Sequence, residues 1–93
     1  MRGYSWGVGS KTFDGVRFMA YAADHEPPHV HGTIGGGIVV LVLLENGAVG
    51  LAERKDAISP GNAPRNVVSK IQRTAAANVD ELWALWEKVH GTR

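Results

Sequence analysis

Eight residues in the first third of the chain gather titratable groups around a rigid corner. The stretch DHEPPHVH, residues 24–31, holds three of the four histidines, an aspartate and a Pro-Pro pair. Two successive prolines favour extended backbone and remove two amide donors, so the corner cannot lie inside a β-ladder. His29 and His31 are two apart on a predicted strand, so their side chains leave the same face, with Cα atoms roughly 6.5 Å apart. Asp24 and His25 lie just across the corner and can fold back toward this pair.

These four groups support three chemistries. In the first, His25, His29 and His31 hold a divalent metal, zinc or a similar ion, and Asp24 is a ligand or orients one imidazole. In the second, one neutral and one protonated histidine cleave RNA without a metal, by activating the ribose hydroxyl and protonating the leaving oxygen. In the third, protonated histidines and free backbone donors bind an anion.

A purely structural interpretation stands beside these three. Asp24 then caps the turn, the prolines set the corner, and both strand histidines lie on a solvated face, because neutral imidazole is an ordinary hydrogen-bonding group. Three histidines and an aspartate within eight residues are nevertheless the kind of cluster that marks functional sites. Both interpretations stay open at this stage.

A second group of residues is basic. Five cations fall between residues 54 and 73, where Asp56 is the only acid; they are Arg54, Lys55, Arg65, Lys70 and Arg73. Lys70 and Arg73 share a helical face at i and i+3. The cations predict either a phosphate-binding surface or an ordinary solvated face. A formal net charge of +1 excludes a strongly basic nucleic-acid binder, so such binding needs a local patch.

The elements that must position these groups form one α+β domain over residues 15–93, after a flexible N-terminal arm or short edge strand over residues 1–14. We expect a small antiparallel β-meander of three to four strands packed against two C-terminal helices. The strands are predicted at residues 16–23, 29–34, 38–44 and 48–53, and the helices at about 63–77 and between Asn78 and Gly91.

Local signals refine this arrangement. Asn46-Gly47 predicts a type I′ hairpin, and Asn78, with Glu81 three residues later, predicts a capping box. Residues 38–44 are apolar at almost every position, which predicts a strand buried on both faces. Two short helices can cover only one face, so the N-terminal arm or a second copy of the chain, in a homodimer, is expected to cover the other.

The tryptophans divide into core and surface. Trp86 shares a helical stripe with other apolar residues and is predicted to lie in the core. Trp83 lies at the edge of that stripe and is a candidate for an interface. Trp6 is expected to fold back from the arm as a plug.

Composition limits the class of protein. The chain has 93 residues, 44% of them hydrophobic, which suits one modest core. It has no cysteine, so disulfides and thiolate metal sites are excluded, as suits a reducing cytoplasm. The longest apolar run, IVVLVLL, is far shorter than the about 20 residues that span a bilayer, and the N-terminus lacks a secretory signal. We expect a cytoplasmic protein without membrane contact.

The corner also carries a resemblance. The run from Gly15 to Tyr21, the DHEPPHVH stretch and the late Trp86-Glu87 pair resemble the bacterial family called domain of unknown function 4160. That family shows the pattern Asp-His-x-Pro-Pro-His-x-His, and the resemblance covers residues 15 to about 90. Its members are described as toxins of type II toxin–antitoxin loci, beside domain of unknown function 2442. The resemblance thus implies a toxin whose protein partner is a cognate antitoxin.

The leading hypothesis is a toxin-like protein whose histidine corner acts on RNA or another phosphate-bearing target. His29 or His31 is then the general base, another histidine the acid, and Asp24 orients one imidazole. Phosphates would be held by the basic residues of the chain, above all Arg65, Lys70 and Arg73. The alternative is a non-enzymatic module with a structural corner, which docks an antitoxin or inhibits a host complex through its apolar strand, Trp83 and Trp6.

Overall fold

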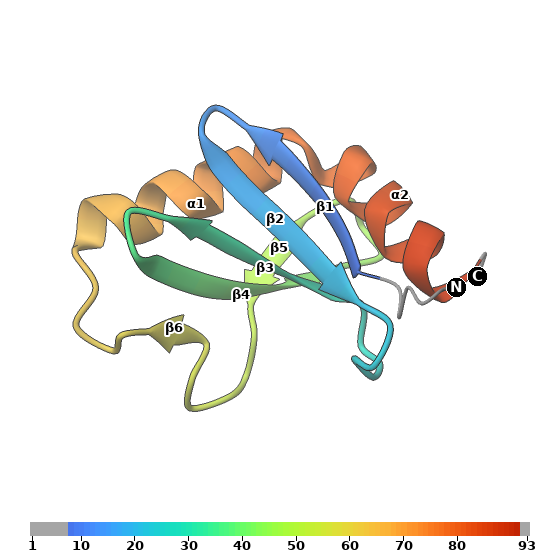
Figure 1. The fold of residues 1–93 in the computed structure, drawn as a ribbon, viewed down its shortest axis with the longest axis horizontal. Helices are drawn as coiled ribbons and strands as arrows, with labels where there is room; N and C mark the ends of the chain where they lie inside the picture. The colour runs from blue at the N-terminus through green and yellow to red at the C-terminus, as the bar shows by residue number, and fades with distance from the viewer. Residues whose placement is uncertain (1–7, 92–93) are drawn as a thin grey trace.

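A computed structural model describes residues 8–91. This part of the chain forms a six-stranded antiparallel sheet with both helices packed on one of its faces (Figure 1), which confirms the α+β prediction with more strands than expected. The elements in chain order are β1 (Val8–Phe13), β2 (Val16–Tyr21), β3 (His29–Ile34), β4 (Gly37–Leu43), β5 (Val49–Leu51), β6 (Ile58–Ser59), α1 (Arg65–Ala77) and α2 (Val79–His90).

The sheet is a meander with one irregular edge. Strands β1 to β5 are neighbours in chain order, and β6 returns to pair with β4 on the edge that β5 also uses. Between β5 and β6, residues 52–57 leave this edge; we call them the 52–57 excursion. The excursion is fastened at both ends to Val40, whose N–H donates to Ala57 and whose carbonyl accepts from Ala52. It therefore stays close to β4.

Strand β1 is a short edge strand, the alternative that the sequence offered to a flexible arm over residues 1–14. Residues 8–13 pair with β2 along its whole length, from Val8↔Tyr21 to Phe13↔Val16, so the domain includes residues 8–14, which the sequence assigned to the arm. The missed signal was Asp14-Gly15, whose φ angles of 51° and 82° are those that a two-residue type I′ turn requires. Residues 1–7, with the predicted Trp6 plug, lie outside the described residues.

The Asn46-Gly47 hairpin is present, but its predicted turn type is wrong. Gly47 has a φ of 83°, and Asn46 has a negative φ, whereas a type I′ turn needs positive values at both. The Gly47 N–H donates to the carbonyl of Leu44, which fits a type I turn followed by a left-handed glycine. The Asn46 side chain instead accepts a hydrogen bond from the Ala48 N–H.

The helices lie where the sequence places them, and α2 ends at Gly91 as expected. The predicted capping box is wrong, because the Asn78 side chain donates to the carbonyl of Thr74 at 2.9 Å and makes no bond to the start of α2. Asn78 thus stabilises the end of α1. Neither helix is long and apolar enough to cross a membrane.

One hydrophobic core fills the space between the sheet and the helices. Val16, Phe18 and Ala20 have no exposed surface, as the alternation of β2 predicts. The other sheet residues of this core are Val30, Val39, Leu41 and Leu43, and its helical residues are Ile71, Ala75, Leu82, Leu85 and Trp86. Trp86 is confirmed as core, and Trp83 is partly buried against the same cluster.

The opposite face of the sheet carries no helix within residues 8–91 and holds the residues that could do chemistry. By alternation, β4 directs Ile38, Val40 and Val42 to this face, and β3 directs His29 and His31 there. Val40 is buried, but Ile38 is 40% exposed, so the predicted burial of this strand on both faces holds only in part. A homodimer that covers this face stays a prediction.

The packing between β3 and the core makes Gly32 a test of the fold. A Cβ added at Gly32 would lie 2.7 Å from both Phe18 and Ile71. We expect Gly32→Ala to lower the free energy of unfolding by about 1–3 kcal/mol, because overpacking displaces core side chains. Urea denaturation measures this, with Gly61→Ala as control, since a Cβ there meets nothing within 4 Å. Equal stability of the two variants would contradict the packing described.

Candidate metal centre

The site lies where β2 and β3 separate. The two strands pair only from Arg17↔Thr33 to Met19↔His31, so the end of β2 does not pair with the start of β3. Residues 22–28 fill this opening. Pro28 is buried, and its carbonyl accepts the N–H of Leu43 at 2.9 Å, which attaches the proline corner to β4. The corner therefore fixes the start of β3 while the segment before it folds back.

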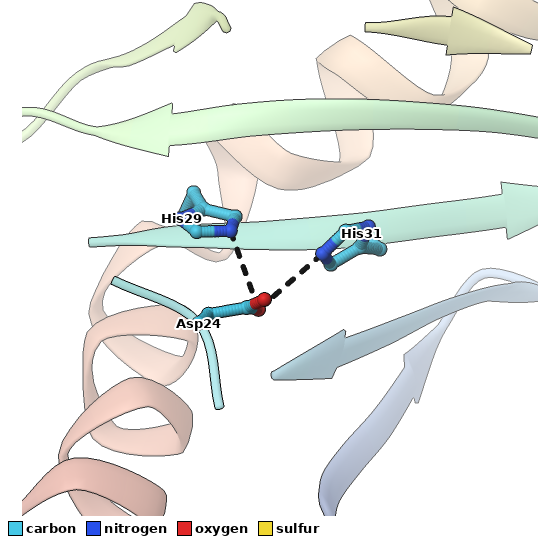
Figure 2. Close-up of side chains that lie close together, drawn as sticks. All are labelled: Asp24, His29 and His31. Atoms are coloured by element: carbon cyan, nitrogen blue, oxygen red, sulfur yellow. Dashed lines mark ion pairs between the residues drawn. The ribbon is translucent and has the colours of Figure 1, made fainter. Parts of the chain in front are cut away.

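Asp24, His29 and His31 converge in this opening. Figure 2 shows Asp24, from the segment between β2 and β3, pointing to the two rings on β3. Its Oδ2 lies 3.2 Å from Nε2 of His29 and 3.4 Å from Nε2 of His31. The side chains are mostly buried, with 12% of His29 and 21% of each of the other two exposed. His29 and His31 thus lie on one face of β3, and Asp24 folds back toward them.

The three facing atoms are buried and make no hydrogen bond, although they lie close together. Asp24 forms an ion pair with either ring only when that ring is protonated. With both rings neutral, these atoms lack partners, and an unsatisfied buried polar atom costs about 1–3 kcal/mol. Two ligands of one tetrahedral ion, each about 2.0–2.1 Å from it, lie about 3.3–3.4 Å apart. The observed separations are close to this value, and one ligand atom from each residue lies within 4.8 Å of the others. Two nitrogens and one oxygen thus lie close enough to hold a metal ion.

The His29 ring is held from two sides. Its Nδ1 lies 2.9 Å from the carbonyl of Pro27, and because a carbonyl only accepts, Nδ1 carries the proton. Nε2 can then present its lone pair to the centre, an arrangement common for metal-binding histidines. The Trp86 ring lies against His29 at 5.5 Å between centroids, and His90 stacks on Trp86 at 3.6 Å. His90 also donates to the carbonyl of Tyr21 at 2.8 Å.

Burial also acts on His31. Loss of water contact lowers the pKa of His31 below its usual 6.5, and the nearby His29 and Arg54 charges lower it further, while Asp24 acts in the opposite direction. The edge of the Tyr21 ring packs on His31, with centroids 5.1 Å apart. Burial therefore favours the uncharged form of His31, which is the form that binds a metal.

A cleft of about 810 Å³ opens beside Asp24 and His29. Its size falls in the range of small-molecule sites, about 300–1,000 Å³. The cleft is lined by apolar residues that include Val40, Val42, Leu44 and Leu51 and by polar residues that include His25, Glu26, Glu53 and Arg54. Leu44 and Leu51 are 39% and 43% exposed, so part of this apolar surface is open to a ligand.

The structure brings together only part of the predicted site. His25 is exposed and lines the cleft but lies outside the three-residue cluster, so Asp24 takes the place expected for a third histidine ligand. Arg54, on the 52–57 excursion, lines the cleft and donates from Nε and Nη2 to Asp56, the latter at 3.0 Å. Lys55 follows Arg54 and is exposed.

The remaining cations lie elsewhere. Arg65, Lys70 and Arg73 belong to α1, which packs on the opposite face of the sheet, and the last two line a shallow hollow beside Ile34. The structure therefore does not bring these three cations to the histidines, and their role in holding phosphates stays a prediction. Sequence reasoning also missed His90, although its position four residues after Trp86 places both on one helical face.

The fold and the site define a small α+β protein that holds two histidines and one carboxylate beside a cleft. The chain belongs to the family described as domain of unknown function (DUF4160), whose model matches residues 15–87. This match contains the whole cluster and both helices up to Glu87. Comparisons with curated proteins and with solved structures found no match.

The environment of His31 predicts its titration. In the metal-free protein, we expect an NMR midpoint for the His31 ring below 6.5, because burial opposes its charging. Between that midpoint and 6.5, the unfolded chain binds more protons than the folded one, so stability falls as pH falls. Thermal denaturation against pH should show a shallower loss for His31→Gln. A His31 midpoint at or above 6.5 would contradict this environment.

Proposed function

We propose that Asp24, His29 and His31 bind a divalent metal ion and that the protein is a metal-dependent hydrolase of a phosphate-bearing substrate. The observation that carries this proposal is the set of three buried polar atoms without hydrogen bonds, facing one point at the edge of a cleft. Pro27 occupies Nδ1 of His29, which leaves Nε2 of that ring available as a ligand, and burial lowers the pKa of His31, which favours the neutral form that a metal needs.

The chemistry follows from three ligands and an adjoining cleft. A bound divalent ion supplies a Lewis acid that polarises a phosphoryl oxygen and makes water a stronger acid. Three protein ligands leave a position for water or substrate, as in catalytic zinc sites. In the hydrolysis that such an ion would promote, a water oxygen would bond to phosphorus as the ester P–O bond breaks, and a proton of that water would pass to the leaving oxygen. His25, Glu26 and Glu53 line the cleft as candidates to transfer that proton.

The metal-free mechanism is a weaker fit. Two histidines that act as acid and base must face opposite sides of a scissile bond. Here both Nε2 atoms face the same carboxylate oxygen, and the rings are only 5.4 Å apart between centroids. This arrangement favours a shared ion over two separate proton transfers.

The family resemblance supports a cellular role as the toxin of a toxin–antitoxin pair in the cytoplasm. A cognate antitoxin is then the expected protein partner, and the hydrolytic site is the source of toxicity. The second candidate, a non-enzymatic binding module, is favoured by the exposed apolar residues Ile38, Leu44 and Leu51. In that case the corner is structural, and a partner protein or a second copy of the chain packs on these residues.

Metal binding tests the proposal directly. We expect the protein to bind one equivalent of zinc, manganese or nickel in isothermal titration calorimetry. Asp24→Ala, His29→Ala and His31→Ala should each weaken binding by at least about tenfold, because each removes one of three ligands. His25→Ala is the matched control and should bind like the unchanged protein. Absence of binding by the unchanged protein would favour the structural interpretation of the corner.

Growth inhibition tests the cellular role. Induced expression of the protein should slow growth, and Asp24→Ala or His31→Ala should relieve the inhibition without loss of the far-UV circular dichroism spectrum. Lys55→Gln changes an exposed charge outside the cleft and should remain toxic. If both site variants remain fully toxic, the site is not the source of toxicity.

A further inference from the structure

The charges that line the cleft are unsuited to a long polyanion. Three carboxylates, Asp24, Glu26 and Glu53, stand against one guanidinium, Arg54, which leaves a net charge of −2 with neutral histidines. A divalent ion at the proposed centre would offset this negative charge. Binding of a polynucleotide draws most of its affinity from several Lys and Arg contacts to successive phosphates. The cleft offers one such cation, and the cations of α1 lie across the sheet.

A single phosphate fits this balance better. Arg54 lines the same cleft as Asp24 and His29, so its positive charge is available to a ligand bound beside the proposed centre. Its guanidinium is 44% exposed and paired with Asp56, which holds it at the cleft without burying it. One phosphate group can therefore lie between the ion and Arg54, where both positive charges attract it.

The floor of the cleft beside this position includes the apolar residues Val42, Leu44 and Leu51 and the glycine Gly50. His29 pairs with Val42 across β3 and β4, so their side chains adjoin on the same face, and Leu44 lies two residues further, about 7 Å along the strand. Gly50 pairs with Val42 from the other side and carries no side chain. A Cβ at Gly50 would contact only Leu44, at 3.7 Å, so the surface over Gly50 is open. Such a surface accommodates a planar ring.

We propose that the substrate is a small organic phosphate in which one phosphate group is joined to an aromatic ring through a short linker, as in a nucleotide. The phosphate lies at His29 and Arg54, and the ring packs on Val42, Leu44 and Gly50. This inference rests on the proposed function, because the phosphate needs the ion to offset the cleft's acidic groups. It names the substrate as a small molecule, where the sequence suggested RNA or another phosphate-bearing target.

The experiment compares ligands that differ by the ring. Zinc affinity is measured first, and the zinc-loaded protein is then titrated calorimetrically with adenosine 5′-monophosphate, ribose 5-phosphate and a short single-stranded RNA. We expect the nucleotide to bind at least about tenfold more tightly than ribose 5-phosphate, because the ring buries apolar surface. RNA should bind no more tightly than the nucleotide.

Substitutions in the cleft test where the aromatic ring of the ligand binds. Gly50→Val fills the open floor and should remove the preference for the nucleotide, while zinc and ribose 5-phosphate bind as before. Leu44→Ser should weaken nucleotide binding several-fold, and Ile38→Ser is its control, since Ile38 is equally exposed on the same strand face but lies outside the cleft. Arg54→Gln should weaken binding of both phosphates.

The outcomes separate this inference from the proposed function. Absence of zinc binding overturns both. Intact zinc binding with equal affinities for the nucleotide and ribose 5-phosphate overturns the ring site alone. Tighter binding of RNA than of the nucleotide, unchanged by Gly50→Val, overturns the small-molecule substrate and leaves the metal centre in place.

Discussion

The structure depends on one energetically unfavourable cluster: a carboxylate oxygen and two imidazole nitrogens are buried together without hydrogen bonds to one another. Polar atoms are rarely left in this state, because each loses its water without gaining a partner. Contacts around the site hold these three side chains together. The Asp24 N–H donates to the carbonyl of Tyr21, the Pro27 carbonyl fixes the ring of His29, and the end of α2 supports that ring through Trp86. A single shared cation would give all three buried polar atoms a partner.

The two faces of the sheet have different roles. One face packs on both helices and contains nearly all of the large buried side chains, so it supplies the stability of the fold. The other carries the histidines, the cleft and the exposed apolar residues of β4. His29 joins the two, because its ring contacts a core tryptophan while its Nε2 belongs to the site. The position of the site thus depends on the packing of α2, although α2 supplies no ligand.

Local sequence was a good guide wherever a residue's neighbours in the chain decide its conformation. The alternation of β2, the strand from His29 to Ile34 and the helical stripes of α1 and α2 lie where their periodicity predicts. The errors in these local signals arose where a side chain had alternative hydrogen-bond partners. Asn78 bonds back to α1 although its spacing fits a cap for α2, and Asn46 accepts a bond within its turn. Both choices have small energy differences, which tertiary packing can reverse.

By itself, the sequence determined that His29 and His31 share a face and that a stiff corner precedes them, because strand alternation and proline geometry are local properties. Only the tertiary structure decided which third residue joins them and which cations are near. Asp24 enters the cluster and His25 does not, because β2 and β3 separate and leave an opening that one side chain fills. Arg54 reaches the cleft while Arg65, Lys70 and Arg73 do not, because α1 packs on the other side of the sheet, and contacts between distant segments cannot be read from spacing along the chain.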